Sequence, residues 1–275
     1  MSALPSTYSL LKINANQTKI GVITQSKYLA IGGLVHVFRP KLGLVVTQGW
    51  PNHSIAESLL DHLAQHPHSL DFDQSLLTDA DASYRQFGIL TCKGQGLAYT
   101  GHNLHAIKGD LIGDGTVAVG NFLSSRTVLP VIMQTAQREA TGSLTDNLYA
   151  SLMAGLKEGG EVRGQQSAAI KVWDISAATS LPELDLRVDD SPVALEELGS
   201  LIEKHHLYFD KPNRETAVAY AKDAFLLKRA RQANPGIQLN TLYDLFRLEN
   251  LEGRWISPAL FDQSAIAFLE QRYLN

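Results

Sequence analysis

The composition and the apolar periodicity of the chain both change near residue 195, and this change limits the possible folds more than any other feature. Of the 21 glycines, 18 lie in residues 1–195, where many apolar residues recur with the two-residue period of strands. Residues 196–275 hold only three glycines but 21 charged residues, and their apolar positions follow a helical period. This division predicts a glycine-rich sheet domain followed by a small helical module, with the looser joint at residues 210–213.

The first part predicts antiparallel sheets covered by helices. Strands are expected at residues 8–14, 19–24, 42–48, 86–91, 96–99, 116–119 and 167–175. Helices are expected at 51–65 (capped by Asn52), 71–82, 127–140 and 144–156, and in the tail at 192–207, 214–232, 240–246 and 264–274. Because strands and helices do not alternate regularly, a doubly wound parallel sheet is disfavoured.

Composition excludes several classes of partner and compartment. A net charge of −4 over 275 residues gives no electrostatic reason to bind nucleic acid or an anionic membrane. The single cysteine, Cys92, excludes an intrachain disulfide and a multi-cysteine zinc site. The first residues lack the charged and apolar regions of a secretory signal, and no apolar run approaches the roughly 20 residues that span a bilayer. We therefore expect a cytoplasmic protein.

Histidine and aspartate pairs offer weak metal candidates. His102 and His105 are three residues apart, but the glycines around them favour a loop over the helix that such spacing needs. We therefore expect no metal and no other cofactor. The pair Asp189-Asp190 has two interpretations of equal weight, a cation or substrate site and a helix cap.

The segment at 159–167 is the most suggestive loop. Glycines flank Arg163, and a flexible backbone that holds a guanidinium suits carboxylate recognition, although a plain surface loop is the simpler interpretation. The sequence contains no phosphate-binding loop, no dinucleotide fingerprint and no Gly-x-Ser-x-Gly motif.

A series of short segments resembles a bacterial family called domain of unknown function 1028. The matches keep their order over about residues 6–209, and in series they are fairly specific. They lie at 7–11, 21–32, 46–52, 84–88, 100–101, 120–121, 159–168 and 185–190. Residues 239–271 also resemble, more weakly, a small peptidoglycan-binding-like domain that often follows that family.

The resemblance implies an α+β fold of the N-terminal-nucleophile hydrolase-like kind, a four-layer αββα sandwich followed by a small helical C-terminal module. It implies a leader at 1–6, a hydrolase-like domain at 7–209 and a helical peptidoglycan-binding-like domain at 212–275. In such hydrolases the first residue of the mature chain attacks an amide, and its own α-amine is the base.

The same resemblance implies roles for individual residues. Thr7 would be the nucleophile, exposed by cleavage after Ser6, and Lys27 would lie near it and lower the pKa of a neighbouring group. Gly120 and Asn121 would stabilise the oxyanion through a backbone amide and a side-chain donor. The expected substrate-binding residues are Ser26, Thr47, Gln48, Arg85, Gln86, Arg163, Gln166, Asp189 and Asp190.

Departures from the family pattern weigh against simple transfer of function. Leu104, Ile107 and Asp110 stand where the pattern has a cysteine, a tryptophan and a histidine, and Val119 replaces a glutamine.

Two hypotheses about function follow. The first is an amide or peptide-bond hydrolase acting on a small amide or peptide-like ligand. The second is a non-catalytic binding or assembly protein that keeps the fold and binds a cell-wall fragment or another subunit. A homo-oligomer is expected in either case.

Overall fold

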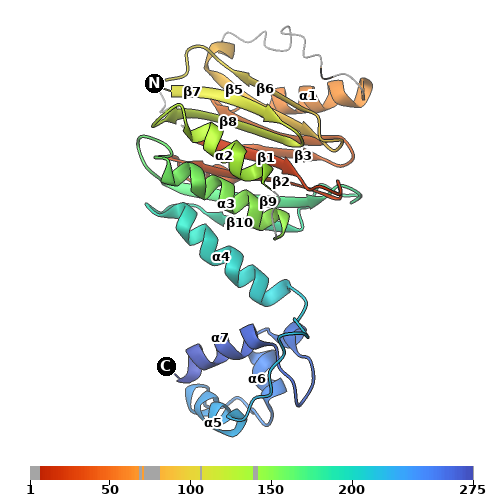
Figure 1. Ribbon diagram of the computed structural model, residues 1–275, viewed down its shortest axis with the longest axis vertical. Helices are drawn as coiled ribbons and strands as arrows, with labels where there is room; N and C mark the ends of the chain where they lie inside the picture. Colours follow the sequence, from red (N-terminus) through yellow and green to blue (C-terminus); the bar gives the residue numbers. More distant parts are fainter. Residues whose placement is uncertain (1–6, 68–69, 71–80, 106, 139–141, 275) are drawn as a thin grey trace. The chain divides into compact units, whose positions relative to one another are not determined.

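Two antiparallel sheets form the first part of the computed structural model, which describes residues 7–67, 70, 81–105, 107–138 and 142–274 (Figure 1). One sheet has the strand order β10-β9-β2-β1-β8-β7 and the other β3-β4-β5-β6. The strands are β1 (Thr7–Ile13), β2 (Lys19–Ser26), β3 (His36–Arg39), β4 (Gly43–Gly49), β5 (Arg85–Thr91), β6 (Gly96–Thr100), β7 (Ile107–Gly113), β8 (Thr116–Leu123), β9 (Ser167–Asp174) and β10 (Leu184–Val188). Every neighbouring pair of these strands is antiparallel, as predicted.

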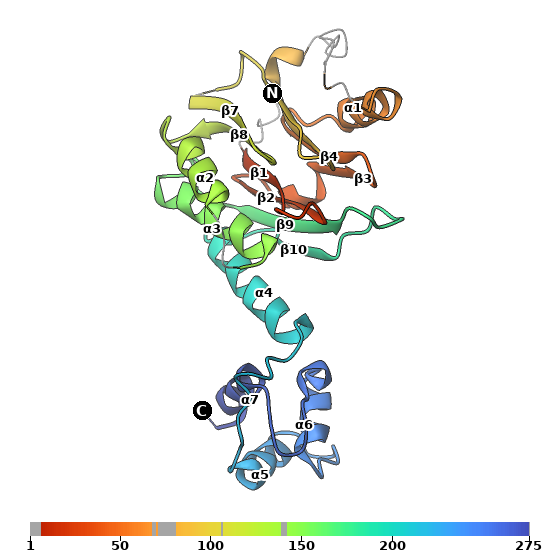
Figure 2. The ribbon, with the colours of Figure 1, turned by 45° about the vertical axis from the view of Figure 1, so that its right-hand side comes forward.

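Helices pack on the outer face of each sheet. Helix α1 (His53–Gln65) begins at Asn52, whose side chain accepts a hydrogen bond from the Ser54 amide as predicted, and its apolar stripe packs on the four-stranded sheet. Helices α2 (Val128–Gln137) and α3 (Leu144–Lys157) lie side by side on the six-stranded sheet (Figures 1 and 2). A Ser143–Asp146 capping box starts α3.

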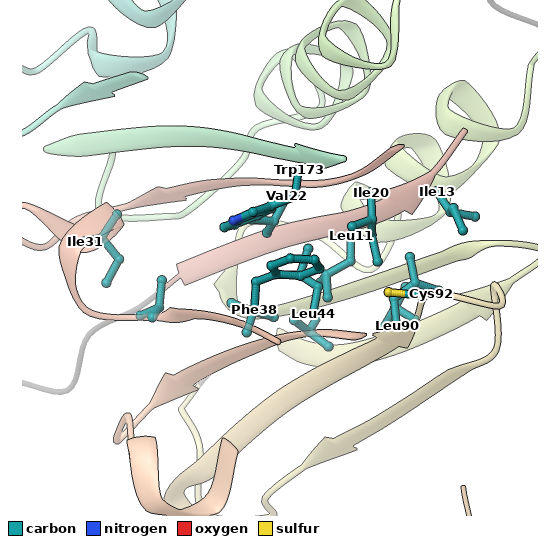
Figure 3. Packing of buried hydrophobic residues seen from close by; sticks show 14 residues of the cluster. Leu11, Ile13, Ile20, Val22, Ile31, Phe38, Leu44, Leu90, Cys92 and Trp173 are labelled. Carbon is teal, nitrogen blue, oxygen red and sulfur yellow. The ribbon is translucent and has the colours of Figure 1, made fainter. Parts of the chain in front are cut away.

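The core between the sheets contains apolar side chains from both of them. Leu11 and Val22 point from the six-stranded sheet toward Leu44 and Leu90 of the other sheet (Figure 3). Phe38 stacks on Trp173 across the same layer, with ring centroids 4.9 Å apart. Since side chains on a strand alternate between faces, every second residue of β1, β2, β4, β5 and β8 faces this layer.

The chain divides into two compact units, Met1–Gly199 and Ser200–Asn275, and the division falls inside α4 (Ala194–Phe209). The second unit has its own apolar core, which includes Leu226, Leu245, Phe246 and Leu269. Its helices are α5 (Asp223–Ala233), α6 (Leu242–Leu248) and α7 (Gln263–Leu274). Within the described residues, no helix has the length and apolar character needed to cross a bilayer.

Several predicted elements need correction. The helix predicted at 214–232 begins only at Asp223, because Val218 pairs in extended conformation with Phe261. The strands β3, β7 and β10 were not predicted. All three are sheet edges, where one side of the strand has no neighbour and the apolar pattern is weak. Most of the helix predicted at 71–82 lies outside the described residues, and residues 82–84 form a short 3₁₀ turn.

The inter-sheet core predicts a specific stability difference between two leucines. Leu44→Ala removes a fully buried side chain from this core and should lower the free energy of unfolding by about 2–5 kcal/mol. Leu181→Ala is the matched control, because Leu181 is 75% exposed and its loss should cost less than about 0.5 kcal/mol. Urea unfolding of the two variants measures both values, and equal losses would contradict the assignment of the core.

Candidate functional site

The layer between the sheets is apolar toward one end and polar toward the other. The polar residues occupy the same alternating positions as the core residues, so they face the same layer. They form a connected hydrogen-bond network, and seven of the eight are buried; the eighth, His36, is half-buried. The network consists of Thr7, Ser9, Ser26, Thr24, His36, Gln48, Gln86 and Asn121.

Two glutamine side chains lie at the centre of this network. Gln48 Nε2 donates to the carbonyl oxygen of Thr7 (3.0 Å) and to Gln86 Oε1 (2.8 Å). Gln86 Nε2 donates to the carbonyl oxygens of Gly109 and Gly120, both at 3.0 Å. A carbonyl oxygen only accepts, so these contacts determine which end of each amide is nitrogen.

The amide orientations determine the direction of every hydrogen bond out to His36. Ser9 Oγ must donate to Gln48 Oε1 (2.8 Å), because that oxygen only accepts. Ser9 therefore accepts from Thr24 Oγ1 (2.8 Å), and Thr24 in turn accepts from His36 Nε2 (2.8 Å). The His36 ring therefore carries a proton on Nε2.

The other ring nitrogen of His36 has a different environment. Nδ1 is shielded from water and has no hydrogen-bond partner among the described residues. Desolvation lowers the pKa of His36 to about 3, and the nearby Lys171 ammonium adds to this effect. The ring therefore stays neutral down to strongly acidic pH in the folded protein.

Thr7, the predicted nucleophile, lies at the start of β1 and is completely buried. Its Oγ1 is 3.1 Å from Ser26 Oγ, the residue opposite it on β2. Its carbonyl oxygen is held by Gln48, which is bound to Gln86. The structure therefore brings Thr7 together with three of the predicted substrate-binding residues.

Asn121, a predicted oxyanion donor, belongs to the same network. Its Nδ2 donates to Gln86 Oε1 at 2.8 Å, and its Oδ1 is buried without a partner in the described residues. The next residue, Phe122, has φ +55°, a left-handed conformation that costs a bulky residue about 1–3 kcal/mol. Backbone strain of this kind directly after a buried, incompletely paired side chain is typical of functional sites.

Gly120, the other predicted oxyanion donor, has little space for a side chain. A Cβ atom there would lie 3.0 Å from Leu123 and 3.1 Å from Tyr8. Its carbonyl oxygen is one of the acceptors that orient Gln86. Gly120 thus contributes its backbone directly to the network.

Arg163 and Gln166 have partners outside this network. The Arg163 Nε donates to the Glu161 carboxylate at 3.0 Å, and its guanidinium lies 4.6 Å from the centroid of the Phe122 ring. Gln166 Nε2 donates to the Asp190 carboxylate at 3.1 Å. Arg163 therefore covers the residue that follows Asn121.

Four other predicted residues also have partners elsewhere. Lys27 follows the last residue of β2 and donates from Nζ to the Gln165 carbonyl (3.0 Å). Thr47 faces α1 and accepts from the Asn52 amide (3.0 Å). Arg85 donates to the Trp50 carbonyl (2.6 Å), and the Asp189 carboxylate contacts Arg187 (3.3 Å).

The opposite face of β1 carries a second buried polar pair. Burial raises the pKa of Tyr8, and the carboxylates of Glu161 and Glu196 raise it further, so the phenol stays protonated. The Tyr8 hydroxyl and Glu161 Oε2 are both buried without partners in the described residues. Tyr8 follows Thr7 directly, so this pair lies behind the first strand rather than in the inter-sheet network.

The remaining candidates for metal or thiol chemistry are the acidic, histidine and cysteine side chains. The described part of the chain contains no group of three His, Cys, Asp or Glu residues placed to hold a metal ion. Burial raises the pKa of the Cys92 thiol to about 11, so it is protonated at neutral pH and packs as a core residue.

Sequence reasoning missed Ser9, Thr24 and His36. A signal for the first two was present, because Ser9 lies two residues before Leu11 and Thr24 two residues after Val22, on the face that carries the core. His36 carried no such signal, because its strand β3 was itself not predicted.

Comparison with known proteins gives a family and a related structure. The model of a family described as a family of unknown function (DUF1028) matches residues 7–198. The crystal structure of protein SPO2555 from Silicibacter pomeroyi, assigned to that family, is similar with a TM-score of 0.64 and 27% sequence identity, covering 73% of this chain and 89% of that chain. No functionally curated protein matches the sequence.

A more distant similarity involves Anbu, an ancestral β-subunit. Anbu from Yersinia bercovieri matches with a TM-score of 0.37 and 9% identity over 85% of this chain and 100% of that chain. The helical Anbu assembly from Pseudomonas aeruginosa matches with a TM-score of 0.33 and 12% identity over 76% and 99% of the two chains. These scores are too low to carry an argument about function.

The neutral His36 predicts a pH dependence of stability. Its pKa is about 3 in the folded protein and 6.5 in the unfolded chain, so below pH 6.5 the unfolded chain binds a proton that the folded protein does not. This group's contribution is complete above pH 6.5 and is lost as the pH falls from 6.5 toward 3, at no more than about 1.4 kcal/mol per pH unit.

The matched variant for this test is His36→Gln, which keeps an N–H donor toward Thr24 but does not titrate. Denaturant unfolding of both proteins between pH 7 and pH 4 isolates the histidine, because all carboxylates are common to both. We expect the wild type to lose more free energy of unfolding than the variant. Parallel curves would contradict a His36 ring that stays neutral in the folded protein.

Proposed function

The chain belongs to the DUF1028 family, a family of unknown function, and we propose that it is an amide or peptide-bond hydrolase with Thr7 as its nucleophile. Cleavage of the peptide bond between residues 6 and 7 would make Thr7 N-terminal. One observation carries the proposal: Thr7 begins β1 with its hydroxyl beside Ser26 and its carbonyl oxygen held by Gln48. A residue held this firmly keeps its reactive atoms in a fixed geometry.

The proposed chemistry uses the two functional groups of one residue. The free α-amine of Thr7, with a pKa near 8, takes the proton from Oγ1, and Oγ1 forms a bond to the carbonyl carbon of the substrate amide. The carbon–nitrogen bond then breaks, and the leaving amine takes the proton. Water hydrolyses the resulting ester and returns the hydroxyl proton to Thr7.

Asn121 is the proposed donor to the oxyanion. An amide nitrogen carries two hydrogens, and Gln86 accepts one from Asn121 Nδ2, which leaves the second for the substrate. A donor of this kind contributes roughly 3–4 kcal/mol to the transition state. Gly120 supplies a backbone amide in this proposal, and Lys27 a nearby positive charge.

The proposal includes a finer description of the fold and of the substrate. The packing of α1 on one sheet and of α2 and α3 on the other supports a four-layer αββα sandwich of the N-terminal-nucleophile hydrolase-like kind. Arg85, Arg163 and Gln166 are the proposed contacts for a carboxylate on a small amide or peptide-like ligand. In this division, residues 7–209 carry out the chemistry and residues 212–275 form a separate module.

A covalent probe tests the nucleophile without knowledge of the substrate. Three proteins are compared. They are the full-length chain, a chain that begins at Thr7 after removal of a cleavable tag, and the same Thr7-initiated chain with Thr7→Ala. A β-lactone, which acylates an N-terminal threonine at Oγ1, should increase the mass of only the Thr7-initiated chain by one probe. Thr18→Ala, an exposed threonine in the β1–β2 turn, is the control and should leave labelling unchanged.

The second candidate is a non-catalytic binding or assembly protein. It is favoured by one observation: Thr7 is completely buried and follows another residue in the encoded chain, so its amine is blocked. In that case the helical module would bind a cell-wall fragment or another subunit. An unlabelled Thr7-initiated chain would contradict the hydrolase, and light scattering then measures whether the chain assembles with further copies of itself.

A further inference from the structure

The second compact unit contains a cavity that four aromatic side chains line together with apolar and polar ones. Its volume is about 600 Å³, within the usual range for small-ligand sites. The lining includes four aromatic rings, from Tyr220, Tyr243, Trp255 and Phe261, and one carboxylate, from Asp223. These residues come from three separated parts of the unit, so the cavity exists only in the folded module.

The four rings are strongly tilted relative to one another. Tyr243 and Trp255 have centroids 5.1 Å apart and planes at 67°, and Trp255 and Phe261 have centroids 5.2 Å apart and planes at 74°. Tyr220 and Phe261 are 6.5 Å apart at 78°. Rings at such angles present their faces in several directions, whereas flat stacking of a sugar or a base needs a single exposed ring face. We call these four rings the aromatic box.

The box is held in place by buried polar contacts. Arg254 and Asp262, the neighbours of Trp255 and Phe261 in sequence, form a buried two-point ion pair at 2.9 and 3.0 Å. The Phe261 backbone exchanges two 2.9 Å hydrogen bonds with Val218. The site is therefore largely preorganised, which lowers the entropic cost of binding a ligand.

One further contact orients a wall of the box. The Tyr220 hydroxyl, on a residue that lines the cavity, donates to the Glu270 carboxylate at 3.1 Å. Lys222 is 3.5 Å from the same carboxylate. The ring of Tyr220 is thus fixed by its hydroxyl.

The charged side chain in the described lining is acidic. It belongs to Asp223, and the described lining contains no lysine, arginine or histidine. The backbone amides of Asn240 and Thr241, which also line the cavity, donate to the Asp244 carboxylate at 2.9 and 2.8 Å. These donors are therefore occupied and offer nothing to an anionic ligand.

We propose that this cavity binds a methylated ammonium group, with the aromatic faces surrounding the methyl groups and Asp223 balancing the charge. Ring faces carry negative electrostatic potential and attract cations that are only weakly hydrated. A trimethylammonium group has an apolar surface that fits an aromatic box and a charge that suits a carboxylate. This site lies in the helical module and does not depend on the proposed hydrolase chemistry.

Calorimetric titration of the full chain tests the proposal with matched ligands. Choline is compared with 3,3-dimethylbutan-1-ol, which has the same shape but no charge. Choline should bind at least about tenfold more tightly, because the neutral ligand gains no cation–π attraction. Nε-Trimethyllysine is titrated in a separate arm, since a free metabolite and a modified protein both carry this group. Binding of either cation supports the site, and the relative affinities identify the source.

Variants connect the binding to the box. Trp255→Leu should weaken choline binding about tenfold, and Asp223→Asn should weaken it several-fold. Trp255→Phe, which keeps a ring, should bind choline more tightly than Trp255→Leu. Phe225→Leu on α5 is the control, because Phe225 is 56% exposed and outside the lining, and should bind like the wild type. Circular dichroism checks that each variant is folded.

Three results would overturn the proposal. The first is equal binding of choline and its neutral analogue, which would show a merely apolar pocket. The second is unchanged choline binding by a folded Trp255→Leu chain, which would show that choline binds outside this cavity. The third is no binding of either cation by the wild type.

Discussion

The hydrogen bonds of Gln48 are the contacts on which the rest of the inter-sheet site depends. This buried side chain joins the Thr7 backbone to Gln86 on one side and to Ser9 on the other. Each buried polar group left unpaired costs about 1–3 kcal/mol, so a network of this size persists between two sheets only when nearly all of its members are paired. Both amide hydrogens and the carbonyl oxygen of Gln48 have partners.

The same constraint explains how the interior of the first unit is divided. Apolar side chains such as Leu11, Leu44 and Leu90 supply the burial that holds the sheets together. The polar end contributes little net stability but places side chains in single orientations. The exceptions to complete pairing are Asn121 Oδ1 and His36 Nδ1, and the strained Phe122 lies directly after the first of them. Function is therefore expected at this end of the layer.

The sequence predicted the strand and helix order well where periodicity is local. Gln48 and Gln86 were identified through the family resemblance, because they lie in its matched segments at 46–52 and 84–88. The short edge strand β3 was not predicted, and His36 was therefore missed. An edge strand has a weak apolar pattern, and its pairing depends on residues distant in sequence. Long-range pairing also determines the contacts of Arg163. Its partners Glu161 and Phe122 are brought together by a bridge between Leu123 and Glu161, which the sequence did not predict.

The proposed chemistry requires that Thr7 become the first residue of the mature chain. Intact-mass measurement of the protein isolated from the cells that naturally make it shows where the mature chain begins. We expect a mass that corresponds to a chain beginning at Thr7. A mass that includes residues before Thr7, in protein isolated from those cells, would contradict it, because the blocked amine could not act as the base.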